Sequence, residues 1–138
     1  MTSGSSIHVV ATTIPATRDA LATAATLAEA IDARVHVIVA LAIPSDGSLD
    51  RQSAPVQAFA KEIRQLPEAA SPRVRVLPCV CRRITDIAQL LPRQAVVIMG
   101  GRSRRWWPTR EQRLAHDLEG LGYRVTFVHT VARNEDQP

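Results

Sequence analysis

The chain has 138 residues, which is enough for one domain with a single hydrophobic core and too few for two. Hydrophobic residues make up 46% of the sequence but aromatic ones only 4%, so the core must be built from Val, Ile, Leu and Ala. The formal net charge of +4 comes almost wholly from arginine, because Lys61 is the only lysine. Guanidinium groups favour phosphate and carboxylate partners, although an arginine bias can equally reflect the base composition of a genome.

No segment approaches the roughly 18 apolar residues of a membrane span, and the first residues, MTSGSS, are polar. The sequence therefore predicts a soluble, cytoplasmic protein that does not enter a membrane. We expect one domain over residues 7–131, with disordered tails at residues 1–6 and 132–138.

The first elements are short and apolar. Ile7–Ile14 reads as a strand that Pro15 ends, and Ala16–Ala33 carries apolar positions at helical spacing, with Thr17 as the expected cap. Val35–Ile43 is a nearly continuous apolar run. Such a run is typical of a strand that is covered on both faces.

The middle of the chain alternates loops with further elements. Pro44–Ala54 is rich in Ser, Asp and Gly and predicts a loop, after which Pro55–Leu66 predicts a second helix. Val74–Cys81 is the third expected strand. A short third helix opens near Thr85 and ends before Pro92.

The last third predicts a fourth strand at Ala95–Met99, a fourth helix at Thr109–Leu121 and a fifth strand at Arg124–His129. Gly122 is placed to end the helix in the left-handed conformation. Five strands alternating with four helices predict an α/β fold: a Rossmann-like α/β/α sandwich with a five-stranded parallel sheet and right-handed crossovers.

The turn after the fourth strand is the most informative segment. An apolar strand that ends in Gly100 and Gly101 and precedes a helix has the form of a βα turn that lets backbone approach a ligand. Three arginines surround this turn: Arg102, Arg104 and Arg105. Guanidinium groups beside a helix N-terminus predict an anion site.

The order and lengths of these elements resemble the universal stress protein family, and VVIMGGRS and the closing YRVTFVH carry the resemblance best. It covers Ile7–His129 and implies a five-stranded α/β sandwich. In ATP-binding members the fourth strand leads into a loop of Gly, two residues, Gly, nine residues, then Gly with Ser or Thr. Here Ser103 or Arg104 stands where the second glycine belongs, and Thr12 and Thr13 replace the aspartate that the family commonly places after its first strand.

If the strand order resembles that of the family, the first and fourth strands are neighbours at the topological switch point, where crevices open. The residues expected to line that crevice and bind a ligand are Thr12, Thr13, Gly100, Gly101, Arg102, Ser103 and Arg105. Hydroxyls, backbone N–H groups and guanidiniums all donate to phosphate oxygens. The alternative is that the arginines form a solvated face and the glycines only make a tight turn.

Trp106 and Trp107 precede Pro108 in this loop. One tryptophan could stack on a base, but packing beneath the start of the fourth helix is the favoured interpretation. The basic residues do not follow one helix face, so nucleic-acid binding is not expected.

Other reactive residues do not form a recognisable catalytic or metal site. Cys79 and Cys81 lie on the same face of a strand, where two buried hydrophobic residues are favoured over a redox pair or half a metal site. His8 and His36 fall inside apolar strands and are interpreted as satisfied core or edge histidines.

These observations leave two main hypotheses. The first is a non-enzymatic stress-response or signalling domain that binds a nucleotide, such as ATP, or another phosphorylated anion, while the sequence indicates no definite cofactor. The second is a nucleotide-independent interaction module that works as a homodimer through the last strand, YRVTFVH, which the family order places at a sheet edge. Slow nucleotide hydrolysis is a third reading, but the loop lacks both a base and a metal-binding carboxylate.

Overall fold

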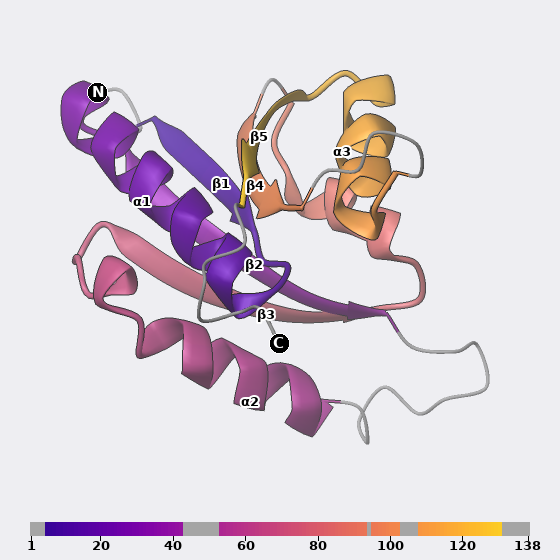
Figure 1. Ribbon diagram of the computed structural model, residues 1–138, viewed down its shortest axis with the longest axis horizontal. Helices are drawn as coiled ribbons and strands as arrows, with labels where there is room; N and C mark the ends of the chain where they lie inside the picture. The colour runs from indigo at the N-terminus through magenta and orange to yellow at the C-terminus, as the bar shows by residue number, and fades with distance from the viewer. Residues whose placement is uncertain (1–4, 43–52, 94, 103–107, 131–138) are drawn as a thin grey trace.

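The computed structural model describes residues 5–42, 53–93, 95–102 and 108–130 (Figure 1). Its strands form one parallel sheet in the order β3-β2-β1-β4-β5. The strands are β1 (Ser6–Val10), β2 (Arg34–Ala42), β3 (Val74–Cys81), β4 (Val96–Gly101) and β5 (Arg124–His129). The predicted α/β sandwich is confirmed, and so are the adjacency of β1 to β4 and the edge position of β5.

Helices cover both faces of the sheet, as Figure 1 shows. The helical elements in the described residues are α1 (Ile14–Ile31), α2 (Ser53–Arg64), α3 (Arg110–Gly120) and two 3₁₀ helices, η1 (Pro67–Ala69) and η2 (Ile84–Leu90). Side chains alternate along each strand, so Val9, Val37 and Ile98 pack toward α1 and α2. Val10 and Met99 face the other way, toward η2 and α3.

The start of α1 differs from the sequence-based expectation. The strand β1 ends at Val10 instead of Ile14, and Ile14 and Pro15 belong to the first turn of α1. Proline fits there because the first helical amides have no intrahelical acceptor. Thr13, not Thr17, is the N-cap: its hydroxyl oxygen accepts a hydrogen bond of 3.2 Å from the Ala16 amide.

Two left-handed residues end α1 and α3. Asp32 follows α1 with φ 54°, and Gly122 follows α3 with φ 99°, as predicted. The amide of Gly122 donates to the Glu119 carbonyl and that of Tyr123 to the Leu118 carbonyl, which is a Schellman motif. These turns direct the chain into β2 and β5.

The remaining elements match the expected ones closely. The bounds of β3 and β5 are those predicted, whereas the short helix near Thr85 is η2, a 3₁₀ helix. The expected loop ends two residues early, because α2 begins at Ser53. Residues 43–52, which include most of that loop, lie outside the described residues, as do residues 1–4 and 131–138 at the two ends of the chain. Within the described ranges, no helix combines the length and the apolar content needed to cross a bilayer.

Candidate functional site

The residues predicted to form the site lie at the carboxyl ends of β1, the central strand, and its neighbour β4. In a parallel sheet these ends share one edge, and the helices that follow the strands begin there. Accordingly, α1 begins at Ile14 after β1, and α3 begins at Arg110 after β4. Two helix N-termini, which carry partial positive charge, thus face the same edge from opposite sides of the sheet.

Thr12 connects the two strands at this edge. Its hydroxyl donates a hydrogen bond of 2.7 Å to the Gly100 carbonyl, and its amide donates one of 2.9 Å to the Thr17 hydroxyl. Thr17 is fully buried, so its hydroxyl fixes the turn between β1 and α1. Thr12 and Gly100 are therefore brought together as predicted, while the role of Thr17 went unrecognised in the sequence.

The two glycines face opposite helices. A Cβ atom added to Gly100 would meet the backbone carbonyl of Ala16, with the carbonyl carbon 2.9 Å away. A Cβ atom added to Gly101 would lie 2.6 Å from Cβ of Glu111 and 3.1 Å from Cζ of Phe127. Each glycine thus allows the first turn of a helix to approach the sheet closely, and the side-chain positions of both are filled by the protein itself.

Arg102 directly follows the last residue of β4. It is exposed, and its carbonyl accepts a hydrogen bond of 2.7 Å from the Thr109 hydroxyl. Thr109 also caps α3 in a capping box with Gln112. Arg102 and Thr109, the residues at the two ends of the segment between β4 and α3, are therefore joined directly. Ser103 and Arg105, together with Arg104 and both tryptophans, lie outside the described residues.

Some of the hydrogen-bond donors at this edge are free to contact an anion, and others are already used within the protein. The hydroxyl of Thr12 already donates to Gly100, whereas the hydroxyl of Thr13 accepts from the Ala16 amide and keeps its own proton to donate. Arg102 adds an exposed positive charge. Glu111 contributes a carboxylate to the first turn of α3, where it competes with an anion for the helix N-terminus.

The two cysteines behave as the hydrophobic interpretation expects. Cys81 is buried and Cys79 partly so, and both are free thiols. Burial, followed by the charges of Asp86 and, for Cys81, of Cys79, raises the pKa of both thiols above the ordinary value. A thiol with a raised pKa is a poor nucleophile at neutral pH, which argues against a reactive pair.

The sheet brings His8 and His36 together, which the sequence did not reveal. They are register partners on β1 and β2, with ring centroids 5.2 Å apart and ring planes at 88°. Burial, and then the charge of His36, lowers the pKa of His8. The expectation of satisfied histidines is wrong for His8, whose buried Nδ1 has no hydrogen-bond partner among the described residues.

Comparison with solved structures identifies a similar fold. A crystal structure described as a universal stress protein in complex with cAMP aligns with a TM-score of 0.63 and 16% sequence identity. The alignment covers 94% of this chain and 100% of that chain. The chain therefore has the fold of a universal stress protein. No family model matches its sequence, and no curated protein does.

Proposed function

We propose that the protein is a non-enzymatic member of the universal stress protein family that binds a nucleotide or another phosphorylated anion at the loop after β4. The observation that carries the proposal is the convergence of two helix N-termini and the exposed Arg102 at the joined ends of β1 and β4. The structural neighbour, which is described in complex with cAMP, supports a nucleotide as the ligand class.

The proposed ligand lies beside Gly100 and Gly101 instead of in their side-chain positions, because α1 and α3 fill those positions. Its phosphate accepts hydrogen bonds from the Thr13 hydroxyl and the Arg102 guanidinium, with Ser103 and Arg105 contributing further donors. Thr12 acts indirectly, by holding β1 to β4 through its bond to the Gly100 carbonyl.

Titration with ATP, AMP and cAMP, followed by tryptophan emission and calorimetry, tests this function. Trp106 and Trp107 flank the proposed site in sequence, so binding should change the emission. Arg102→Ala should weaken binding about tenfold without lowering Tm, because a charge-assisted hydrogen bond contributes about 1.5–3 kcal/mol and Arg102 is exposed.

Arg113→Ala, on the exposed surface of α3, is the matched control and should bind like the original protein. The function fails if no nucleotide binds at millimolar concentration, or if Arg102→Ala and Arg113→Ala lose affinity equally, which would indicate a general charge effect.

The edge position of β5 favours a second function, a homodimeric interaction module. Among the described residues β5 pairs only with β4, which leaves its outer backbone groups available for another strand. Its apolar side chains, including Phe127 and Val128, pack partly against the protein's own core. Pairing would therefore rest mainly on the backbone.

Sedimentation separates this function from the first. A dimer at micromolar concentration that Thr126→Lys weakens, and that Gln57→Lys at an exposed position of α2 leaves intact, would support pairing through β5. A protein that stays monomeric at micromolar concentration would rule out the homodimeric function, whatever the outcome of the nucleotide titration.

A further inference from the structure

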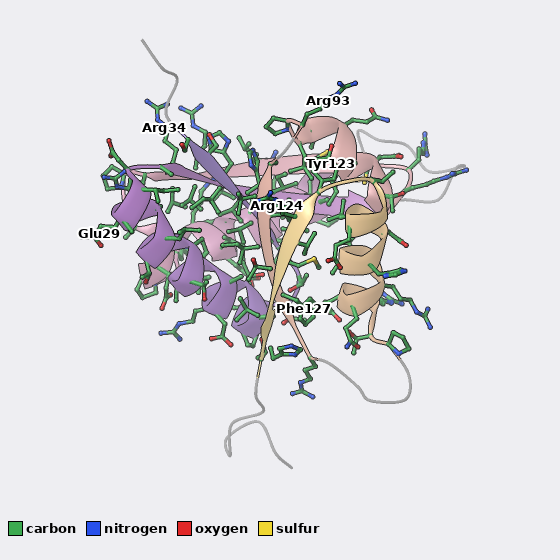
Figure 2. All side chains as sticks on the ribbon, turned by 90° about the horizontal axis from the view of Figure 1, so that it is seen from above. Glu29, Arg34, Arg93, Tyr123, Arg124 and Phe127 are labelled. Atoms are coloured by element: carbon green, nitrogen blue, oxygen red, sulfur yellow. The ribbon has the colours of Figure 1, made fainter. Side chains whose placement is uncertain are left out.

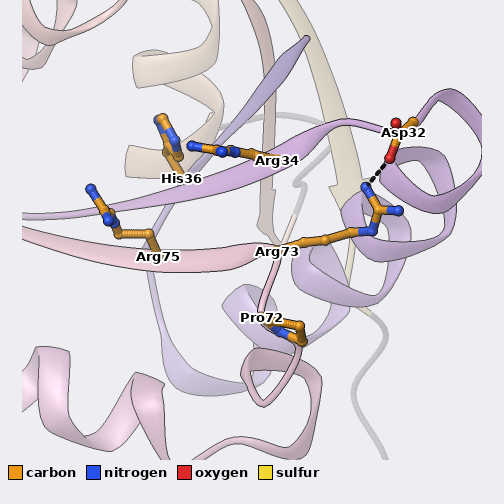
Figure 3. Close-up of a pocket in the computed structure, with 6 residues that line it drawn as sticks. All are labelled: Asp32, Arg34, His36, Pro72, Arg73 and Arg75. Atoms are coloured by element: carbon orange, nitrogen blue, oxygen red, sulfur yellow. Dashed lines mark ion pairs between the residues drawn. The ribbon is translucent and has the colours of Figure 1, made fainter. Parts of the chain in front are cut away.

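A hollow of about 770 Å³ opens at the opposite end of the sheet from the proposed nucleotide site. It is lined by Asp32, Arg34, His36, Pro72, Arg73 and Arg75, which Figure 3 shows. Arg34 opens β2 and Arg75 is the second residue of β3, so the hollow lies at the amino ends of these strands. Figure 2 places Arg34 far from Phe127, which lies near the carboxyl end of β5.

Strand register builds one wall of the hollow. His8, His36 and Arg75 are consecutive partners across β1, β2 and β3, and Arg34 lies two residues before His36 on the same face. In Figure 3 Arg34 and Arg75 project on the same side of the sheet as His36. Farther along that face, Val10 and Ile38 are buried in the core. A polar row thus occupies one end of an otherwise apolar face.

The hollow carries a positive charge that the described residues do not neutralise. Its single carboxylate, on Asp32, pairs with Arg73 at 2.9 Å, and Arg73 also donates to the Ala33 carbonyl at 3.0 Å. The guanidiniums of Arg34 and Arg75 have no ion-pair or hydrogen-bond partner in the part of the chain that the structure describes. Like charges on adjacent strands repel one another, so this arrangement costs folding free energy that a bound anion would offset.

The histidines respond to this charge. Burial, followed by the charges of Arg75 and Arg34, lowers the pKa of His36. Behind it, His8 is only 4% exposed, and its Nδ1 lacks a hydrogen-bond partner among the described residues. An anion held by the two arginines would oppose their effect on His36, whose protonated ring could then donate to it.

We propose that this hollow binds a small molecule carrying two or more phosphate groups, with Arg34 and Arg75 each holding a phosphate and His36 donating between them. Two unpaired guanidiniums provide forked donors suited to phosphate, and the hollow is larger than a single ion requires. Arg73 is already held by Asp32 and shapes the wall. The site is separate from the one after β4, so both can be occupied together.

Histidine NMR tests the proposal with inorganic pyrophosphate as the probe. The ring signals of His36 should shift on titration. Arg34→Ala should reduce that shift while leaving unchanged any shift of His129, which lies beside Gly101 in register at the other end of the sheet and reports on the site after β4. Arg34→Ala and Arg75→Ala should each weaken binding about tenfold, and Arg113→Ala should leave it unchanged.

The pH dependence provides a second readout. The affinity of the protein relative to that of His36→Gln should increase as the pH falls through the pKa of His36, because protonation of that ring, which faces Arg34, Arg75 and His8, adds a donor and a charge, whereas protonation of the probe affects both proteins equally. The two proteins should bind alike at pH 8 and differ progressively at lower pH. Asp32 pairs with Arg73, so Asp32→Asn should affect affinity less than Arg34→Ala.

Three results would overturn the proposal. The first is no movement of the His36 signals at millimolar pyrophosphate. The second is an equal loss of affinity in Arg113→Ala and Arg34→Ala, which would indicate general charge attraction. The third is far tighter binding of a short single-stranded oligonucleotide with the same dependence on Arg34, which would make a nucleic-acid backbone the ligand.

Discussion

At the scale of single residues, the same glycine pattern has two physical explanations. Gly100 and Gly101 follow an apolar strand, which predicts close approach of backbone to a ligand. The structure shows close approach of backbone to the protein's own helices, with Ala16 over Gly100 and Glu111 over Gly101. Both explanations require a residue without a Cβ atom, so sequence alone does not separate them.

Alanine substitution at Gly100 should destabilise the fold. The added Cβ meets the backbone of Ala16, which cannot move without displacing α1, so Gly100→Ala should lower the free energy of unfolding by about 1–3 kcal/mol. Gly120→Ala is the control, because a Cβ there meets nothing within 4 Å, and it should be neutral or stabilising by up to about 1 kcal/mol. Urea denaturation measures both, and equal values would contradict the packing role of Gly100.

At the scale of elements, capping decides where the helices begin. Thr13 and Thr109 each precede a helix at the edge of the sheet where β1 and β4 end, and each hydroxyl accepts a hydrogen bond from an amide of the first helical turn. The caps fix the direction of α1 and α3 relative to β1 and β4. Thr109 also ties its helix to the Arg102 carbonyl, so one side chain stabilises both the helix and the loop closure.

Loss of the Thr109 cap should cost more than an ordinary helix position. Thr109→Ala removes one capping bond and one loop bond, and we expect a loss of about 1–2 kcal/mol in the free energy of unfolding. Thr26→Ala, at an exposed position of α1, should change it by less than about 0.5 kcal/mol. Thermal and urea denaturation would measure the difference, and a Thr109 variant as stable as the Thr26 variant would show that the cap is dispensable.

At the scale of the whole molecule, exposed arginines lie at both ends of an aliphatic core. Arg102 lies at the carboxyl ends of the strands, and Arg34 and Arg75 lie near their amino ends. Between them the sheet is buried by α1 and α2 on one face and by η2 and α3 on the other. Each end of the sheet therefore presents exposed positive charge, which favours the anionic ligands proposed for it.

Stability should fall in mild acid because of His8 and His36. Their pKa values are lower in the folded protein than the unfolded value of about 6.5, so the unfolded chain binds more protons near and below that pH. Above about pH 7 both histidines are neutral in either state and do not lower the free energy of unfolding. As the pH falls through about 6.5, the free energy of unfolding decreases by at most about 1.4 kcal/mol per pH unit for each histidine. The decrease stops once the pH passes below the folded pKa values.

Urea denaturation between pH 5 and pH 8 checks this dependence. Replacing both histidines, His8 with Leu and His36 with Gln, should flatten the curve in that window, whereas His116→Gln on exposed α3 should preserve it. An unchanged slope in the double variant would assign the acid sensitivity to other groups.

The sequence by itself determined the fold class and most element positions. Apolar runs bounded by Pro and Gly predicted β3 and β5 to the residue, and their alternation with amphipathic segments predicted a covered parallel sheet. Element positions depend on local pattern and on chain connectivity, both of which a sequence contains. The adjacency of Thr12 and Gly100 was expected only through the resemblance to the universal stress protein family, whose strand order places the ends of β1 and β4 together.

Only the tertiary structure decided which side chains share a row across the strands. His8, His36 and Arg75 lie 28 or more positions apart in sequence, and their alignment depends on the register of β1, β2 and β3. A shift by one residue would turn each strand's side chains to the opposite face, so no single strand predicts such a row. The start of α1 also needed the tertiary structure. A proline can follow a strand or stand in the first turn of a helix, so the sequence placed the end of the strand at Pro15. The hydrogen bond from the Ala16 amide to the Thr13 hydroxyl shows that Pro15 belongs to the helix.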